Sequence, residues 1–438
     1  MTVSGRRSRL NAPFAVAGGA CITMADALMH PLLILPLFVA QLTTSYRSVA
    51  LIVAVSSIGW FLGQLVAPPL LRTTVRQLPW ALGGAIVRLL AIVLLAYDGY
   101  NSAGESNEQR LRTFFVCLIA FSVANGFSHH PTLRLLDRTL PPSSQGASIA
   151  WRNGLGLLLA IVAGLVARRA LGAGSPPFPK NFSLIFVVAA AALALSTFLL
   201  TRLREVPGRS PDLEVASANI LSPLKDGNLL RLMSFAGLAA LASGADPFFV
   251  IFALRGLALP LHWAGIYLVV SAAAILVSTP LWRALLLRAG PRALLQGAVA
   301  VHVLAPILAI AIPRVATSAL YLDKVTNPRL ALALYAVVFA SISVAVCGQA
   351  IGVFAYLNGM APDHARARYA SVMNLLLLVA AAAPLLAARI LERDGFERLF
   401  LISSIAGLAT VFASGLLANP NARAQTPSQA WRLRGIRP

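Results

Sequence analysis

The sequence predicts an all-α integral membrane protein of about twelve transmembrane helices, arranged as two six-helix halves. Three observations lead to this class. First, the 438 residues are 58% hydrophobic and only 12% charged, with a mean hydropathy of +0.77, whereas about a quarter of an ordinary soluble chain is charged. Second, apolar runs of about 20 residues, long enough to cross a bilayer, recur along the chain. Third, one polar interval divides these runs into six and six.

The apolar runs are expected to be helices because they are continuously apolar and lack the alternation of membrane β-strands. The first run follows Arg6, Arg7 and Arg9 and resembles a signal peptide, but it is long enough to span the membrane, so we expect it to be retained as the first helix. The runs lie near residues 14–40, 49–70, 79–97, 113–133, 148–167, 182–201, 232–254, 263–282, 293–312, 330–356, 370–388 and 399–417.

The polar interval at 202–231 contains prolines and glycines, which break helices and mark loops. It therefore predicts a linker between two halves. The expected organisation is an N-terminal half at 1–201, a cytoplasmic linker at 202–231, a C-terminal half at 232–417 and a basic cytoplasmic tail at 418–438.

The two halves are related in sequence. Residues 136–167 align without a gap on residues 357–388, and the alignment places Pro141 on Pro362 and Asn153 on Asn374. A nearly equal offset places the acidic residue of the first helix on that of the seventh. Because each half has an even number of helices, both copies run in the same direction, which indicates a parallel internal repeat.

The formal net charge of +21 does not indicate a nucleic-acid-binding protein. The Lys and Arg residues of the chain lie in short clusters between apolar runs and form no continuous basic face. Such clusters are typical of cytoplasmic loops. A moderate excess of Lys and Arg falls in the segments that are inside if the N-terminus is inside. We therefore expect a multi-pass protein of the cell (inner) membrane with both termini in the cytoplasm.

No pattern for an enzyme, a metal or a cofactor is present. Cys21, Cys117 and Cys347 all lie in apolar runs without CxxC or Cys/His spacing, so we expect neither a disulfide framework nor a zinc site. No GxxxxGK[ST] phosphate-binding loop occurs, which argues against ATP as the energy source.

A loop motif between the eighth and ninth helices resembles that of the major facilitator superfamily of transporters. Residues 280–292 read PLWRALLLRAGPR, in which Arg288, Gly290 and Arg292 match the family signature. Arg283 and Leu287 replace the glycine and the aspartate of that signature. A weaker copy follows the second helix, and its residues are Gly63, Pro68, Pro69, Arg72 and Arg76.

The resemblance implies a parallel two-fold repeat, a substrate site near the midplane between the halves and transport by alternating access. It also implies that the loop residues Arg288, Gly290 and Arg292 contribute to gating. The candidates nearest the cytoplasmic gate in other helices are Arg152, Asn153 and Asn374, for which a helix cap is the alternative interpretation.

Asp26 is the main candidate for the chemistry of transport, because an ionisable group inside the membrane is costly and usually functional. His30 lies one helical turn further along, and Pro31 favours a bend there. A carboxyl group shielded from water and an imidazole can both exchange protons near neutral pH. We interpret the pair as a proton site or a substrate ligand; the alternative is a buried pair that fixes helix packing.

Asp246, followed by Pro247, is the counterpart of Asp26 in the seventh helix, and the resemblance implies that the two carboxylates face each other across the cavity. The alternative is a structural Asp that pairs with Arg255 or the backbone. Arg88 and His302 are expected to serve packing or the lipid interface. Further polar candidates for the cavity are Asn125 and His129 in the fourth helix and Gln349 and Tyr356 in the tenth.

The sequence therefore predicts a secondary active transporter of a small solute, driven by protons and monomeric in the bilayer, with no cofactor. Two alternatives remain open at this point. One is a transporter-like scaffold that helps to assemble a membrane complex. The other is a transporter of lipids or other amphiphiles.

Overall fold

The computed structural model describes residues 3–71, 74–101, 106–140, 142–205, 222–316, 318, 329–362 and 365–418. Within these ranges the chain forms α-helices and one short 3-10 helix, and no strand. The predicted all-helical membrane fold is confirmed. Most of the predicted linker (206–221), most of the predicted tail (419–438) and Arg72 of the first loop motif lie outside the described residues.

Within the described ranges, the N-terminal half contains seven helices. The first apolar run forms two of them, because the helix ends at Leu28 and restarts at Ile34. The helices are α1 (Val3–Leu28), α2 (Ile34–Leu42), α3 (Tyr46–Leu71), α4 (Leu78–Tyr100), α5 (Asn107–Thr139), α6 (Pro142–Ala170) and α7 (Lys180–Thr201).

The C-terminal half begins after the short helix η2 (Ser222–Lys225) and repeats the broken first helix. Here the break lies at Gly244 and Ala245, directly before Asp246 and Pro247. The helices are α8 (Gly227–Ser243), α9 (Asp246–Gly256), α10 (Trp263–Ala316), α12 (Arg329–Met360), α13 (Arg366–Ala380) and α14 (Ala383–Gly415).

Two helices contain an internal break, and one of them is too long for a single crossing. Helix α10 has 54 residues, about 80 Å at 1.5 Å per residue, against a bilayer core of about 30 Å. Its backbone is non-helical at Gly290, with φ 82° and ψ 176°, and α14 has the same break at Gly395. Both positions require glycine, because a side chain disfavours positive φ.

The number of crossings follows from these breaks. Nine segments of the described chain are long and apolar enough to span a membrane. Division at Gly290 and Gly395 raises the number of spanning segments from nine to eleven, and α1 together with α2 forms the twelfth. The expected number of twelve thus rests on this division and not on a direct count.

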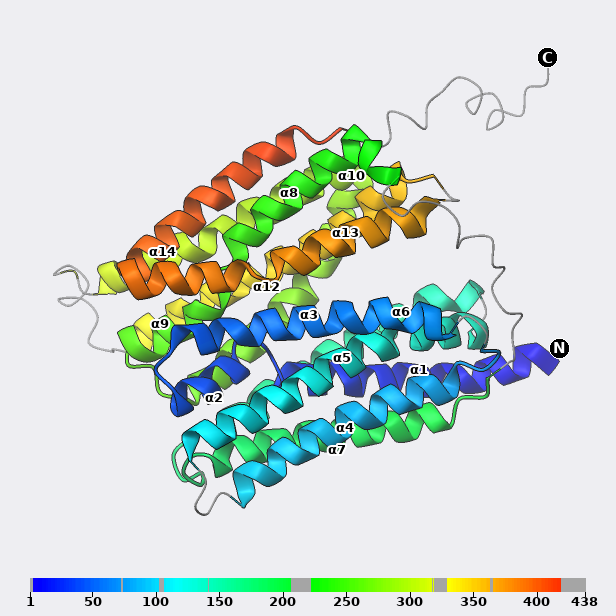
Figure 1. Ribbon diagram of the computed structural model, residues 1–438, viewed down its shortest axis with the longest axis horizontal. Coiled ribbons are helices and arrows are strands. Elements are labelled where there is room, and N and C mark those ends of the chain that lie inside the picture. Colours follow the sequence, from blue (N-terminus) through cyan, green and yellow to red (C-terminus); the bar gives the residue numbers. More distant parts are fainter. Residues whose placement is uncertain are drawn as a thin grey trace.

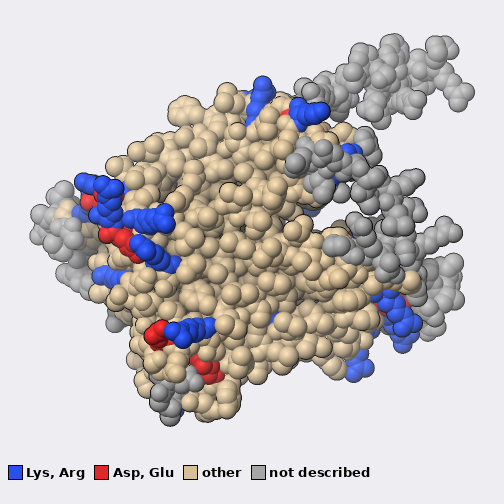
Figure 2. All heavy atoms as spheres, viewed as in Figure 1, with Lys and Arg blue, Asp and Glu red and all other residues tan. Residues whose placement is uncertain are grey.

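The two halves lie side by side (Figure 1), joined by α6 against α10 and by α3 against α14. Helices α6 and α10 cross so closely at Gly164 and Gly265 that a Cβ on Gly265 would lie 2.5 Å from the Gly164 carbonyl oxygen. In the view of Figure 2, charged residues gather at the two ends of the bundle and a broad uncharged belt lies between them. Such a belt suits a bilayer core.

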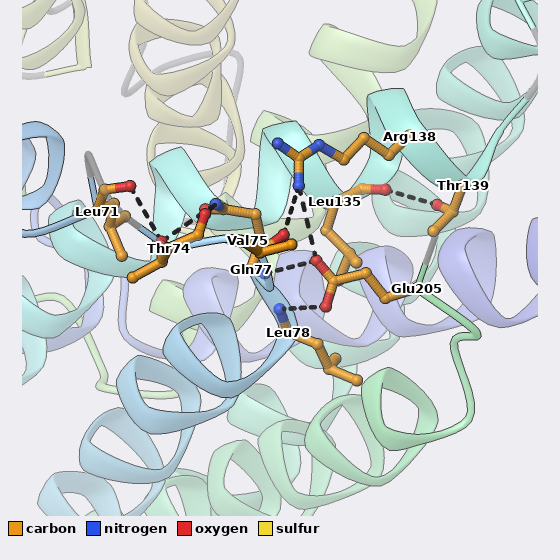
Figure 3. A network of polar contacts seen from close by, with 9 residues as sticks. All are labelled: Leu71, Thr74, Val75, Gln77, Leu78, Leu135, Arg138, Thr139 and Glu205. Carbon is orange, nitrogen blue, oxygen red and sulfur yellow. Dashed lines mark hydrogen bonds and ion pairs between the residues drawn. The ribbon is translucent and has the colours of Figure 1, made fainter. Parts of the chain in front are cut away.

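Helix α1 begins and α14 ends at the same end of the bundle (Figure 1), which we call the proximal end; the opposite end is the distal end. At the proximal end, Glu205 after α7 anchors the start of α4 (Figure 3). Its carboxylate accepts the N–H groups of Gln77 at 2.5 Å and Leu78 at 3.1 Å, and Arg138 of α5 lies 3.9 Å away. A carboxylate at this position accepts hydrogen bonds from free N–H groups of the helix terminus, and its negative charge interacts favourably with the helix dipole.

Candidate functional site

A cavity of about 300 Å³ lies in the N-terminal half between α1, α3 and α5. Its wall combines a carboxylate, small hydroxyl and amide groups, and aromatic rings. The lining residues are Asp26, Met29, Pro31, Ser56, Ser57, Trp60, Phe61, Leu118, Phe121, Ser122 and Asn125. A mostly apolar pocket with a few polar groups is the usual form of a small-molecule site.

Asp26 is the ionisable group of this wall. Its side chain is 43% exposed, and its Oδ1 accepts a hydrogen bond of 2.6 Å from Nη2 of Arg88 in α4. The Arg88 side chain is only 4% exposed and its guanidinium lies 4.9 Å from the centre of the Phe121 ring. Arg152 of α6 also interacts electrostatically with Asp26. The cavity therefore contacts Asp26, the partly exposed member of an ion pair whose other member, Arg88, is buried.

Pro31 explains why Asp26 lies near a break. Proline has no N–H and disfavours helical geometry at the preceding residue, so α1 ends at Leu28 and the chain turns until Ile34. The carbonyl oxygen of His30 accepts N–H groups from residues 33, 34 and 35 within the turn. Broken helices of this kind line the binding sites of many transporters.

The expected pairing of Asp26 with His30 is wrong. One helical turn separates them in sequence, but His30 lies beyond the end of α1 and therefore not on the same helical face. Its Nδ1 accepts the Leu32 N–H at 3.2 Å, which stabilises the turn. The partner of Asp26 is Arg88, from a different helix.

The expectation that Asp246 faces Asp26 across the cavity is also not met. Asp246, at the start of α9, is 5% exposed and lies 3.2 Å from Nε2 of His302 in α10, which is 3% exposed. Asp246 does not line the cavity. Nor does it pair with Arg255, which donates instead to the carbonyl oxygens of Thr43 and Thr44.

Of the other predicted cavity residues, some lie in or beside the cavity and others lie elsewhere in the protein. Asn125 lines the cavity. His129 is exposed and its ring lies 5.8 Å from that of Trp60, a lining residue. Gln349 is half-buried outside the lining. Tyr356 is 1% exposed and its hydroxyl donates to the Ala418 carbonyl oxygen at 2.9 Å, which is a packing role.

The predicted gating residues differ in their surroundings. Gly290 forms the break in α10, Arg288 is exposed, and Nη2 of Arg292 donates to the Gly415 carbonyl oxygen at 2.5 Å. Asn153 is exposed and Asn374 is half-buried. Arg152 lies against Gly19 of α1, and so belongs to the interior of the N-terminal half.

Sequence reasoning missed Arg88 and His302 as partners of the two acids. A usable signal existed for Arg88, since it is the one charged residue in the apolar run at 79–97 and an unpaired charge there is costly. Ser56, Ser57 and Trp60 were also missed, because small hydroxyls and single aromatics are common in any membrane helix.

The two halves are joined at the distal end by contacts that we call the distal clasp: Tyr46, Arg47, Arg255, Glu392 and Phe396. Nε of Arg47 lies 2.9 Å from Oε2 of Glu392. Arg255 lies 4.9 Å from the centre of the Tyr46 ring, and that ring lies 5.7 Å from Phe396.

The proximal end differs, since Figure 2 shows a hollow between the halves there. The structure is therefore closed at the distal end and parted at the proximal end.

Among the described residues, no group of three or more His, Cys, Asp or Glu side chains is placed to hold a metal ion. The pairs Asp26–Arg88 and Asp246–His302 lie in different halves, and each consists of one acid with one base.

The profile of the Major Facilitator Superfamily matches residues 15–377. The chain therefore belongs to this superfamily of transporters, as the loop motif and the repeat indicated. Among curated protein sequences, none matches this chain.

Solved structures of the same fold are similar over nearly the whole chain. A bacterial homologue of the iron transporter ferroportin in the inward-facing state has a TM-score of 0.69 at 14% identity and covers 95% of this chain and 99% of its own. A D-xylose–proton symporter has a TM-score of 0.67 at 13% identity, with coverages of 93% and 98%. The nucleoside transporter NupG has a TM-score of 0.61 at 13% identity, with coverages of 95% and 99%.

Proposed function

We propose that this protein is a secondary active transporter that moves a small solute by alternating access and is coupled to protons at Asp26. The observation that carries the proposal is the position of Asp26, partly exposed in the wall of the 300 Å³ cavity and bound to the buried Arg88. A proton that reaches the cavity can neutralise Asp26 and release Arg88. Proton binding is thereby linked to a rearrangement inside the bundle.

Alternating access is supported by the unequal ends of the molecule. With the predicted topology, in which the proximal end is cytoplasmic, the closed distal clasp and the parted proximal end correspond to an inward-facing state. Rocking of the halves about α3, α6, α10 and α14 would exchange these contacts and expose the cavity to the other side, as in transporters with parallel repeats.

The lining favours a neutral polar solute with a flat apolar face. Arg88 already balances Asp26, so the cavity has no unmatched carboxylate to select a cation. Ser56, Ser57 and Asn125 offer hydroxyl and amide groups, while Trp60 and Phe61 offer aromatic faces. Monosaccharides and nucleosides combine these features, and they are also the solutes of two transporters with a similar fold.

The test is uptake into proteoliposomes. Purified protein in vesicles with an imposed pH gradient should accumulate one or more labelled monosaccharides or nucleosides, and a protonophore should abolish the accumulation. Candidate solutes are first selected by thermal shift, because a ligand that binds the folded state raises its melting temperature. A protein that acts only as a scaffold would bind and move none of them, with or without the gradient.

A further inference from the structure

A second and smaller cavity, of about 50 Å³, lies inside the N-terminal half. Helices α1, α4, α5, α6 and α7 enclose it, and both Arg88 and Arg152 contribute to its wall. The Asp26–Arg88 pair connects the two cavities, since Asp26 lines the larger one and Arg88 the smaller one. The smaller cavity is therefore distinct from the proposed solute site.

The small cavity has more positive than negative charge. The Nε atoms of Arg88 and Arg152 are both buried and lack a hydrogen-bond partner within the described ranges. Both guanidinium groups act electrostatically on one carboxylate, that of Asp26, and only Arg88 is hydrogen-bonded to it. A buried charge with an unpaired donor is costly unless a further group compensates it. Two arginines and one carboxylate leave one positive charge in excess.

The backbone of α1 provides the room for this arrangement. A Cβ on Gly19 would lie 2.4 Å from Nε of Arg152, so a larger residue there would displace the guanidinium. Gly18 and Gly19 both line the cavity, as do the hydroxyl-bearing residues Ser128 and Ser196. The Ser128 hydroxyl already donates to the Asn125 carbonyl oxygen, so the donors that the wall offers are chiefly those of the two arginines.

We propose that this cavity binds a small inorganic monoanion of halide or nitrate size. One monoanion balances the excess charge and gives both Nε donors an acceptor. The volume sets the size, because a water molecule needs about 10–15 Å³ on this measure, and 50 Å³ therefore admits a few water-sized bodies but no larger organic solute. This inference goes beyond the proposed function and does not depend on which solute is transported.

The test is saturable anion binding to the full-length protein in detergent. Unfolding is followed at constant ionic strength while sodium gluconate, whose anion is too large for the cavity, is replaced by sodium bromide or nitrate. The expected result is a rise in melting temperature that saturates. Arg152→Gln should raise the half-saturating concentration about tenfold or more, since it removes one charged hydrogen-bond donor. Arg169→Gln, at an exposed arginine of the same helix, should leave it unchanged.

Two further readouts make the test decisive. In gluconate alone, Arg152→Gln should not lower the melting temperature, because it removes the positive charge that is in excess around Asp26. Bromide NMR line broadening in the presence of wild-type protein should be reversed by excess nitrate, and Gly19→Ala should weaken it. A response that does not saturate, or one equal in wild type and Arg152→Gln, would overturn the proposal and leave ordered water as the occupant of the cavity.

Discussion

Asp26 and Asp246 hold matching positions in the first helix of each half, yet their surroundings differ. Asp26 is partly exposed to a cavity, and its partner is a permanently charged arginine. Asp246 is sealed in the core, and its partner is a histidine, which can be neutral. Of the two acids, only Asp26 is partly exposed, so the repeat preserves the acid but not its surroundings.

Asp26→Asn tests the coupling residue. We expect proton-driven accumulation to be lost, because the amide cannot take up a proton, while exchange of solute down its own gradient survives. Both activities are measured in the same proteoliposomes. Glu108→Gln is the matched control, since Glu108 forms an exposed pair with Arg112 and should be neutral. Full accumulation by Asp26→Asn would exclude this residue as the coupling site.

Asp246 should instead affect stability. Asp246→Ala leaves His302 buried without its partner, which costs about 1–3 kcal/mol, so the melting temperature of the purified protein should fall. Replacement of both partners can be nearly neutral, and we therefore expect Asp246→Ala with His302→Leu to recover part of the loss. If the single variant melted like wild type but lost transport, Asp246 would belong to the transport site.

At the level of single residues, the sequence predicted which positions carry charge inside the membrane but not their partners. The position of Asp26 on the cavity wall follows from its place in an apolar run beside a proline. Its pairing with Arg88 does not, because helical periodicity defines a face and leaves open which helix packs against it. The pairing with His30 was wrong because Pro31 ends the helix before the spacing rule can apply.

At the level of elements, the sequence predicted the apolar spans and the bend at Pro31, but not the corresponding break before Asp246. Pro31 lies within the break of the first helix, and Pro247 lies directly after the corresponding break in the C-terminal half. Gly290 and Gly395 interrupt α10 and α14 at positive φ. Apolar runs of span length gave the helices themselves. The cavity between α1, α3 and α5 could not be predicted in the same way, because its volume depends on how tightly the helices pack, as at Gly63 of α3 against α5.

The anchor of α4 provides a prediction at this scale. Glu205→Ala leaves the N–H groups of Gln77 and Leu78 without their acceptor and removes a partner of Arg138. Loss of a helix cap typically costs about 1 kcal/mol. We expect a lower melting temperature and faster tryptic cleavage after Arg76, measured by limited proteolysis. Unchanged cleavage would show that the start of α4 is held by packing alone.

At the level of the whole molecule, the two halves share one fold but differ in where their cavities and polar groups lie. The ion pair on the cavity wall and the two cavities described above lie in the N-terminal half. The C-terminal half contributes the buried Asp246–His302 pair and one side of the distal clasp. Rocking motions need contacts that form in one state and break in the other. Exposed ion pairs suit this purpose, since each contributes about 0–1 kcal/mol.

The last prediction concerns the distal clasp. Arg255 donates to two carbonyl oxygens of the other half and stacks on Tyr46, whereas Arg47 makes a single pair with Glu392, at side-chain exposures of 65% and 31%. Arg255→Ala should therefore open the distal end more than Arg47→Ala. For Arg47→Ala, a loss of up to about 1 kcal/mol corresponds to at most about a fivefold shift.

Opening is measured at the cavity wall. Ser57→Cys, in a chain whose native cysteines are replaced, is labelled in intact cells with a membrane-impermeant thiol reagent, and the predicted topology places the distal end outside. Labelling should be slow with the clasp intact and faster in Arg255→Ala. Arg314→Ala is the control, because Arg314 pairs with Glu397 within one half at the same end. Equal labelling rates in all variants would show that α6 against α10 and α3 against α14 close the distal end without the clasp.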